Sequence, residues 1–136
     1  MELIDKFSLQ VHEGEYESWP LKSILYYCGL PLEKKVNGYF IDKQYELSDY
    51  FLLFINWDCP FEESCEIVVL NKLKKVVGQY SIGSAYNSYN LHSISVISNH
   101  CYKLVYSNNV TVELCVNYPK NHWFSKVVKV KHVVSK

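Results

Sequence analysis

Five histidines and five cysteines are the residues of this 136-residue chain best suited to nucleophilic chemistry. A serine or cysteine nucleophile needs a histidine base within hydrogen-bond reach. His100 and Cys101 come closest in the sequence, but adjacent residues of a strand point to opposite faces, so we do not expect them to bond to each other. The other histidines lie in no recognisable catalytic motif: His12, His92, His122 and His132. A small hydrolase that uses His100 or a cysteine remains an alternative.

The cysteines show no metal-binding motif. The nearest pair, Cys59 and Cys65, is separated by five residues, whereas zinc sites usually place two to four residues between paired cysteines. Cys101 and Cys115 lie in alternating apolar segments, where a free cysteine behaves as a small buried hydrophobe. We therefore expect reduced thiols, a cytoplasmic protein and no bound metal.

Carboxylates and glycines do not suggest an enzyme either. Acidic pairs such as Glu62 with Glu63 and Glu13 with Glu15 lie in polar stretches, where burial is not available to shift a pKa toward acid–base catalysis. The chain has five glycines and none of the patterns G-x-x-x-x-G-K, G-x-G-x-x-G or H-E-x-x-H. We expect a protein that is not an enzyme and that carries no cofactor.

Charge is separated along the chain although the formal net charge is zero. Residues 1–66 hold thirteen acids and five lysines, a formal charge of −8, and residues 67–136 hold nine lysines and one acid, a charge of +8. Such asymmetry indicates a charged partner, or else attraction between the two halves within one domain. Arginine, the residue that binds phosphate with a bidentate fork, is absent from the sequence.

Two acidic loops, each beside a tryptophan, suggest a binding surface: residues 12–19 and 57–63. Aromatic anchors surrounded by acids capture a basic partner, because the aromatics supply desolvated contact area and the acids speed and orient the encounter. The alternative is that both tryptophans belong to the core and the acids only keep the loops soluble. The expected charged contacts are Glu13, Glu15, Glu17, Asp58, Glu62 and Glu63, and the expected aromatic anchors are Tyr16, Trp19 and Phe61.

One early helix and a series of strands must position these loops. Residues 3–11 alternate as a half-buried strand does. Ser18 is then suited to be the N-cap of a helix over residues 19–28, with Pro20 in its first turn and Gly29 just past its end. The strands that follow are expected at residues 38–43, 50–57, 65–70 and 74–82. We predict one α+β domain over residues 1–136, with a mainly antiparallel sheet of about six to eight short strands and the N-terminal helix packed on it.

A hairpin is expected near the C-terminus. Residues 100–107 and 110–118 flank Asn108 and Asn109, and asparagine tolerates the positive φ of a two-residue turn. That turn predicts the cross-strand pairs Ser107 with Val110, Val105 with Val112, Lys103 with Leu114 and Cys101 with Val116. Residues 123–134 alternate lysine and valine, which is typical of an edge strand protected by charge.

Neither a membrane span nor a cleaved leader is expected. The longest apolar run, residues 50–55, covers six residues, far fewer than the ~20 that cross a bilayer. The first ten residues include Glu2 and Asp5 instead of a basic and then apolar leader.

In size and composition the chain resembles the small bacterial immunity proteins of contact-dependent growth inhibition and related polymorphic toxin systems. The resemblance rests on residues 18–22, 50–60 and 91–118, and covers most of the chain without a diagnostic motif. It implies a protein without enzymatic activity that binds a cognate toxin domain, often a basic nuclease, and covers its active or substrate-binding surface. No residue role can be transferred from it. We expect a monomer in a 1:1 complex, with neither membrane nor nucleic acid as the partner.

A different class of function remains open for the basic half. Lysines near an exposed tryptophan are typical of proteins that bind single-stranded nucleic acid or another anionic partner. The residues of that alternative are Lys120, Trp123, Lys126, Lys129 and Lys131.

Overall fold

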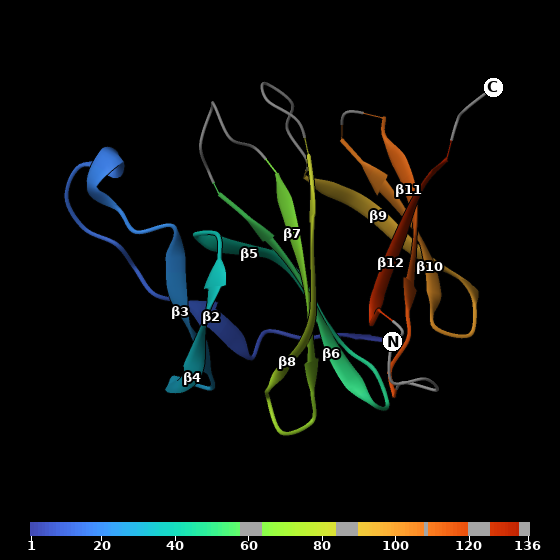
Figure 1. Ribbon diagram of the computed structural model, residues 1–136, viewed down its shortest axis with the longest axis horizontal. Coiled ribbons are helices and arrows are strands. Elements are labelled where there is room, and N and C mark those ends of the chain that lie inside the picture. The colour runs from blue at the N-terminus through green and yellow to red at the C-terminus, as the bar shows by residue number, and fades with distance from the viewer. Residues whose placement is uncertain (58–63, 84–89, 108, 120–125, 134–136) are drawn as a thin grey trace.

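The computed structural model describes residues 1–57, 64–83, 90–107, 109–119 and 126–133. In this part of the chain, twelve strands form three antiparallel sheets (Figure 1). The five-stranded central sheet has the order β1 (Glu2–Leu3), β5 (Phe40–Glu46), β6 (Tyr50–Asn56), β7 (Cys65–Asn71), β8 (Val76–Ile82). A three-stranded sheet is formed by β2 (Phe7–Leu9), β3 (Lys22–Tyr27) and β4 (Leu30–Asn37). The order of the four-stranded sheet is β12 (Val128–Val133), β11 (Thr111–Val116), β10 (Cys101–Tyr106), β9 (Leu91–Ser98).

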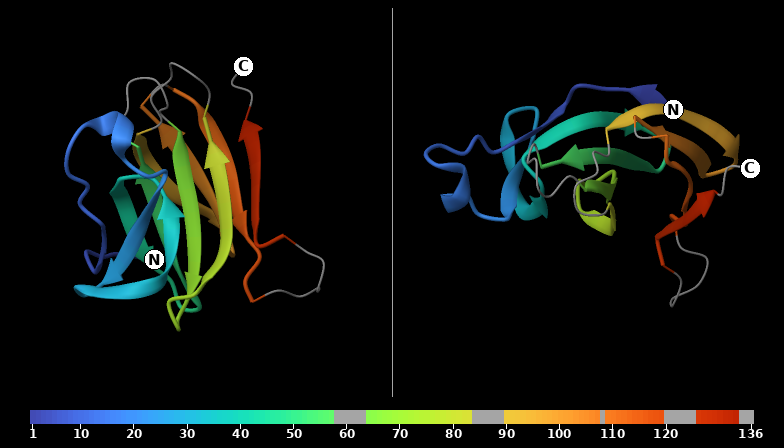
Figure 2. Two further views of the ribbon diagram at one scale, coloured as in Figure 1. Left: turned by 60° about the vertical axis from the view of Figure 1, so that its left-hand side comes forward. Right: turned by 90° about the horizontal axis from the view of Figure 1, so that it is seen from above.

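The two middle strands of the central sheet, β6 and β7, are buried on both faces, which explains the continuous apolar sequence of β6. Successive side chains of a strand point to opposite faces. Tyr50, Leu52 and Phe54 pack in a core shared with the four-stranded sheet. The alternate residues Phe51, Leu53 and Ile55 pack in a second core shared with the three-stranded sheet. The three sheets are therefore layers, with the outer two on opposite sides of the central one (Figures 1 and 2).

The predicted N-terminal helix is wrong, and the fold is all-β instead of α+β. Residues 22–27 form β3, and the helical content of the described residues is a single 3-10 turn, η1 (Tyr16–Ser18). Ser23 and Leu25 are buried while Lys22 is exposed, which is the alternation of a strand. Cys28 and Gly29 both have positive φ (50° and 81°) and join β3 to β4 as a two-residue hairpin turn. Gly29 thus ends a strand where the sequence suggested the end of a helix.

The other predicted strands agree with the structure more closely. β5, β6, β7 and β8 lie where strands were expected. The expected strand over residues 3–11 is divided between β1 and β2, and Val11 at its end is 85% exposed. β12 is an edge strand, as its alternating lysines indicate.

The predicted register of the C-terminal hairpin is wrong by one residue. In the structure Lys103 pairs with Glu113 and Leu104 with Val112. The cause lies at the turn, because Tyr106 N donates to Val110 O at 2.9 Å and encloses one residue more than a two-residue loop has. A slip of one residue moves side chains to the other face. The core face of β10 is consequently formed by its buried residues Tyr102, Leu104 and Tyr106.

The same register overturns the prediction of two reduced thiols. Cys101 lies directly opposite Cys115, with Cα atoms 4.1 Å apart, and the two form a disulfide. In the predicted register Cys101 would face Val116 instead. Of the other cysteines, Cys28 is free and exposed, and Cys65 is free and buried. Cys59 lies outside the described residues.

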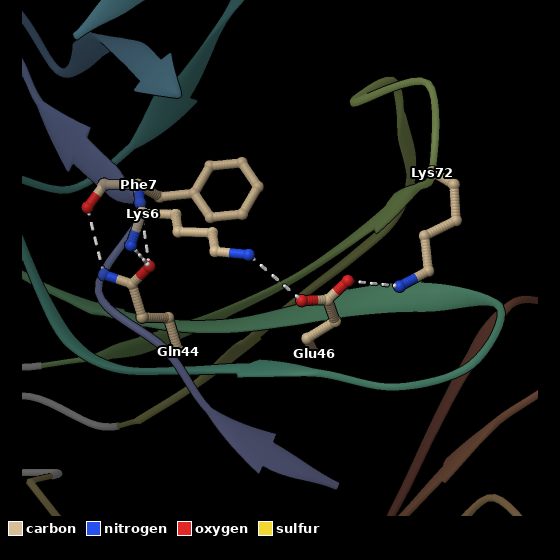
Figure 3. Close-up of polar contacts among 5 residues, drawn as sticks. All are labelled: Lys6, Phe7, Gln44, Glu46 and Lys72. Carbon is tan, nitrogen blue, oxygen red and sulfur yellow. Dashed lines mark hydrogen bonds and ion pairs between the residues drawn. The ribbon is translucent and has the colours of Figure 1, made fainter. Parts of the chain in front are cut away.

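One glutamine fastens the N-terminal segment to the central sheet (Figure 3). Gln44 Oε1 accepts hydrogen bonds from Phe7 N at 2.8 Å and Lys6 N at 3.0 Å, and Gln44 Nε2 donates to Phe7 O at 3.0 Å. Nearby, Glu46 accepts from Lys72 Nζ at 2.9 Å and pairs with Lys6 Nζ at 3.5 Å. These contacts fix the three-stranded sheet against the edge of the central sheet and so position the loop that follows β2.

Candidate functional site

Five aromatic rings gather at one end of the three-stranded sheet, with Tyr39 at their centre. Tyr39 lies in the turn between β4 and β5, and its ring centroid is 5.2 Å from those of both Trp19 and Trp57. It is also 5.3 Å from His12 and 5.6 Å from Tyr16. All four contacts are edge-to-face, with interplanar angles of 75° to 88°. We call these five residues the aromatic cluster.

The cluster joins the first acidic loop to Trp57, the residue at which the second acidic loop of the sequence begins. Trp19 ends the first acidic loop, and Trp57 directly follows β6 at the start of the second. Tyr39 contacts both tryptophans, so the fold brings together two segments that are about forty residues apart. The alternative in which each tryptophan serves only as core is correct in part, because Trp57 is 8% exposed whereas Trp19 is only half-buried.

The first acidic loop is held in place by hydrogen bonds around a buried serine. Ser23 Oγ donates to Gly38 O at 2.6 Å, which uses the only hydrogen of the hydroxyl. His12 Nε2 lies 2.8 Å from the same oxygen and must therefore be the donor in that bond. At the tip, Ser18 Oγ donates to Glu15 O at 2.7 Å and Trp19 Nε1 donates to Gly14 O at 3.3 Å.

A glycine allows Tyr39 to reach its central place. Gly38 has a φ of +111°, and a Cβ atom there would collide with the side chain of Ile55 on β6. Only glycine adopts this backbone without strain and without that collision. The turn can therefore lie directly on the central sheet, with the Tyr39 ring next to Trp57.

Trp57 also connects the cluster to a buried carboxylate. Glu66 on β7 is 7% exposed, and its Oε1 accepts hydrogen bonds from Trp57 Nε1 at 3.2 Å and Ser64 Oγ at 3.4 Å. Its Oε2 accepts a hydrogen bond from Ser81 Oγ. Neither of the two ion pairs in the described part of the chain involves Glu66. Neutral donors thus satisfy this carboxylate, and they hold the Trp57 indole in a fixed orientation.

The predicted contact residues of the first loop lie together on the surface of the cluster. Glu13, Glu15 and Glu17 are exposed, and no ion pair among the described residues involves them. Tyr16 is 37% exposed and packs against Trp19, with ring centroids 5.2 Å apart. The predicted contacts of the second loop lie outside the described residues: Asp58, Phe61, Glu62 and Glu63.

Three residues of this site were not predicted from the sequence: Tyr39, Ser23 and Glu66. A signal for Tyr39 was present, because Asn37-Gly38 is a dipeptide typical of a tight turn between strands. Ser23 had been placed in a helix, where its distance from Gly38 could not be anticipated. Nothing in the sequence distinguishes Glu66 from the other acids of residues 1–66.

The structure describes only part of the basic surface that the nucleic-acid-binding alternative requires. Lys103, Lys129 and Lys131 are exposed on the outward face of the four-stranded sheet, and Lys126 is exposed beside it. None of the residues that share this face through the β10–β11–β12 pairing is aromatic. Base stacking needs aromatic side chains, so the described part of this surface lacks a feature of single-strand binding. Lys120 and Trp123 lie outside the described residues.

The structure also bears on the alternative of a small hydrolase that uses His100 or a cysteine. Cys101 is bonded to Cys115 and has no thiol in this state. His100 Nδ1 lies 3.1 Å from the hydroxyl of Tyr50, which is in turn 2.6 Å from the hydroxyl of Tyr102. Burial raises the pKa of both Tyr50 and Tyr102 above the ordinary value. These phenols remain neutral at physiological pH and bond to each other between two sheets.

A comparison of the chain with known protein families, with curated proteins and with solved structures found no match. In the described residues, no helix is long and apolar enough to cross a membrane.

Proposed function

We propose that this protein is an immunity-type binding protein, which neutralises a cognate toxin domain by covering its active or substrate-binding surface. The aromatic cluster and the three acids of the first loop form the binding surface. The partner offers a basic protein surface. The proposal rests on the contact of Tyr39 with both Trp19 and Trp57, because the buried Trp57 then supports an aromatic cluster that the acids of the first loop border.

The chemistry of this surface is suited to a protein partner. Exposed apolar side chains lie within two residues of cluster residues in the chain: Val11 is 85% exposed, Leu21 66% and Phe40 38%. Protein interfaces combine an apolar and aromatic centre with a charged rim, and aromatic residues supply much of the binding energy. The edge-to-face contacts and the Ser23 hydrogen bonds fix the rings before binding. Less conformational entropy is then lost when the partner binds.

Charge selects the partner. Glu13, Glu15 and Glu17 extend from one short loop, and no described lysine forms an ion pair with them. Their field attracts a positively charged surface, speeds association and disfavours acidic partners. A toxin domain that acts on nucleic acid has such a basic surface, because its substrate is a polyanion. We further propose that the protein acts in the cytoplasm of the producing cell, as a monomer in a 1:1 complex and without catalysis.

Site-specific photocrosslinking tests this function. A benzophenone amino acid at position 16 lies on the aromatic cluster, and the same residue at position 103, on the outward face of the four-stranded sheet, is the control. In the cells that make the protein, we expect a crosslink from position 16 alone. The captured chain, expressed separately, should be a toxin whose activity is lost after addition of one equivalent of this protein. If position 16 captures nothing specific, or the captured chain keeps its activity, the proposed function is wrong.

A further inference from the structure

The outward face of the four-stranded sheet carries an ordered group of sulfur, carboxylate and ammonium side chains. Residues directly opposite in antiparallel strands have side chains on the same face. One cross-strand row contains Cys101, Cys115 and Lys129, and the next contains Lys103, Glu113 and Lys131. This arrangement lies on the opposite side of the molecule from the aromatic cluster and takes no part in the proposed function.

Three donor atoms in these rows lie close enough to bind one ion. The Sγ atoms of Cys101 and Cys115 and a carboxylate oxygen of Glu113 all lie within 4.8 Å of one another. Cys115 Sγ is 3.8 Å from Glu113 Oε1. All three residues are half-buried, so solvent and ions can reach them. The sulfurs form a disulfide in this structure, and in this form they are not metal ligands.

The hairpin does not depend on that disulfide for its geometry. β10 and β11 pair through five residues in register, and each has a further strand on its other side, β9 and β12. The inner faces of both strands are buried in the larger core. Reduction of the disulfide therefore leaves the two cysteines opposite each other on a sheet that is already formed.

We propose that, once its disulfide is reduced, this face binds a zinc ion through Cys101, Cys115 and Glu113. Two thiolates and a carboxylate are ligands that Zn²⁺ accepts, and a water molecule completes the tetrahedron. Two thiolates, one carboxylate and Zn²⁺ together have a net charge of −1. The three lysines of the two rows offset this charge: Lys103, Lys129 and Lys131. This proposal departs from the expectation, drawn from cysteine spacing, that the chain binds no metal.

The exchange between the two forms balances with a dithiol as reductant. A thiolate of the dithiol attacks one sulfur of the pair, breaks the Cys101–Cys115 bond and releases the other sulfur as a thiolate. The second thiolate of the reductant then attacks the mixed disulfide, forms the reductant's own disulfide and releases the second protein thiolate. Two electrons pass to the protein, and Cys101 and Cys115 each gain a proton. Zinc then displaces both protons and binds the two thiolates. The disulfide and the zinc site are thus alternative states of the same two sulfurs, and reducing conditions favour the zinc-bound state.

Zinc titration of the 136-residue chain tests this inference. Cys28→Ser and Cys59→Ser remove the other thiols except Cys65, which stays protonated because burial raises the pKa of its thiol to about 12. After reduction with dithiothreitol and removal of the reductant under argon, competition with a chromophoric chelator gives the zinc affinity. X-ray absorption gives the ligands. We expect one zinc per reduced chain with two sulfur neighbours at about 2.3 Å, and no zinc bound to the oxidised chain.

Variants separate this site from adventitious binding. Glu113→Gln keeps both thiols and should weaken zinc binding by at least about tenfold. Glu33→Gln, a change at an exposed carboxylate on β4, should leave the affinity unchanged. The inference is overturned if the reduced chain binds no zinc or unfolds by circular dichroism. It is also overturned if Cys101→Ser with Cys115→Ser binds as tightly, or if Glu113→Gln has no effect.

Discussion

Tyr39 and Trp57 meet edge to face, with ring centroids 5.2 Å apart and ring planes at 88°. Tyr39 makes the same kind of contact with Trp19, at 5.2 Å and 87°. One side chain in a turn therefore connects the loop after β2 with the end of β6. The binding surface proposed here exists only because of this connection, since each tryptophan alone lies beside a separate loop.

Replacing the central ring should loosen the whole cluster. Tyr39→Ala removes four edge-to-face contacts, and we expect the free energy of unfolding to fall by about 2–4 kcal/mol. Tyr39→Phe keeps the ring and should lose much less. Urea unfolding measures both effects, and near-ultraviolet circular dichroism reports the packing of Trp19 and Trp57. Equal losses in the two variants would show that the ring contacts are not what stabilises this end of the sheet.

The buried Ser23 on β3 should matter far more for stability than the exposed Ser18 of the first acidic loop. Ser23→Ala leaves Gly38 O and His12 Nε2 without their shared partner, and we expect a loss of about 1–3 kcal/mol in unfolding free energy. Ser18→Ala removes an exposed hydrogen bond to Glu15 O and should cost well under 1 kcal/mol. Hydrogen exchange of residues 12–19 should accelerate in Ser23→Ala. Unchanged exchange would mean that this hydroxyl does not hold the loop.

The Gln44 side chain bonds to the backbone of Lys6 and Phe7 as a neighbouring strand would, so its amide should be critical for stability. Gln44→Leu removes three hydrogen bonds to the backbone of Lys6 and Phe7 at a buried place. Unpaired buried groups cost about 1–3 kcal/mol each, so we expect a loss of about 3 kcal/mol or more. Gln10→Leu, which removes a single bond to Ile24 N, is the matched control. The two variants are compared by thermal and urea unfolding, and similar losses would contradict the importance given to the Gln44 amide.

Glu46 should make stability depend on acid pH. A hydrogen bond and the charge of Lys72, followed by the charge of Lys6, lower the pKa of Glu46 below its ordinary value. The folded state thus stabilises the ionised form of the Glu46 carboxyl group more than the unfolded chain does. The resulting stabilisation is fully present above the unfolded pKa of about 4.3 and is lost as the pH falls through the lower folded pKa.

The test is a set of urea unfolding curves from neutral pH to about pH 3. Glu46→Gln should reduce stability at neutral pH, and the difference from the wild type should shrink as the carboxylate is protonated. Added salt should also reduce this difference in stability, because the ion pairs are partly exposed. Glu33→Gln should show neither effect. A difference that stays constant with pH would contradict the ion-pair explanation.

Elements fixed by local pattern were predictable from the sequence, and elements fixed by tertiary contact were not. The apolar run of β6 and the alternating lysines of β12 identify a central and an edge strand without further information. The apolar positions of residues 19–28 fit the spacing of a helix as well as that of a strand. Only the contacts that Ser23 and Leu25 make outside β3 decide between helix and strand. The predicted helix failed because its apolar positions matched two periods.

The candidate site shows the same division. The two acidic loops and their tryptophans were visible as composition, and the acids of the first loop are exposed in the structure. Their meeting through Tyr39 was not visible, because it depends on the turn at Gly38 lying against Ile55. The disulfide was missed for a similar reason, since one additional residue in a turn decides whether Cys101 faces Val116 or Cys115.

The most direct test of the binding surface is the rate of association with the toxin domain captured by crosslinking, measured by stopped-flow at low and at physiological salt. We predict that Glu13→Lys, Glu15→Lys and Glu17→Lys together slow association by roughly tenfold or more at low salt and remove most of its salt dependence. Glu33→Lys, the same change at an exposed acid of β4, should alter the rate less than about twofold. If the triple variant associates as fast as the wild type at both salt concentrations, the first acidic loop is not the binding surface.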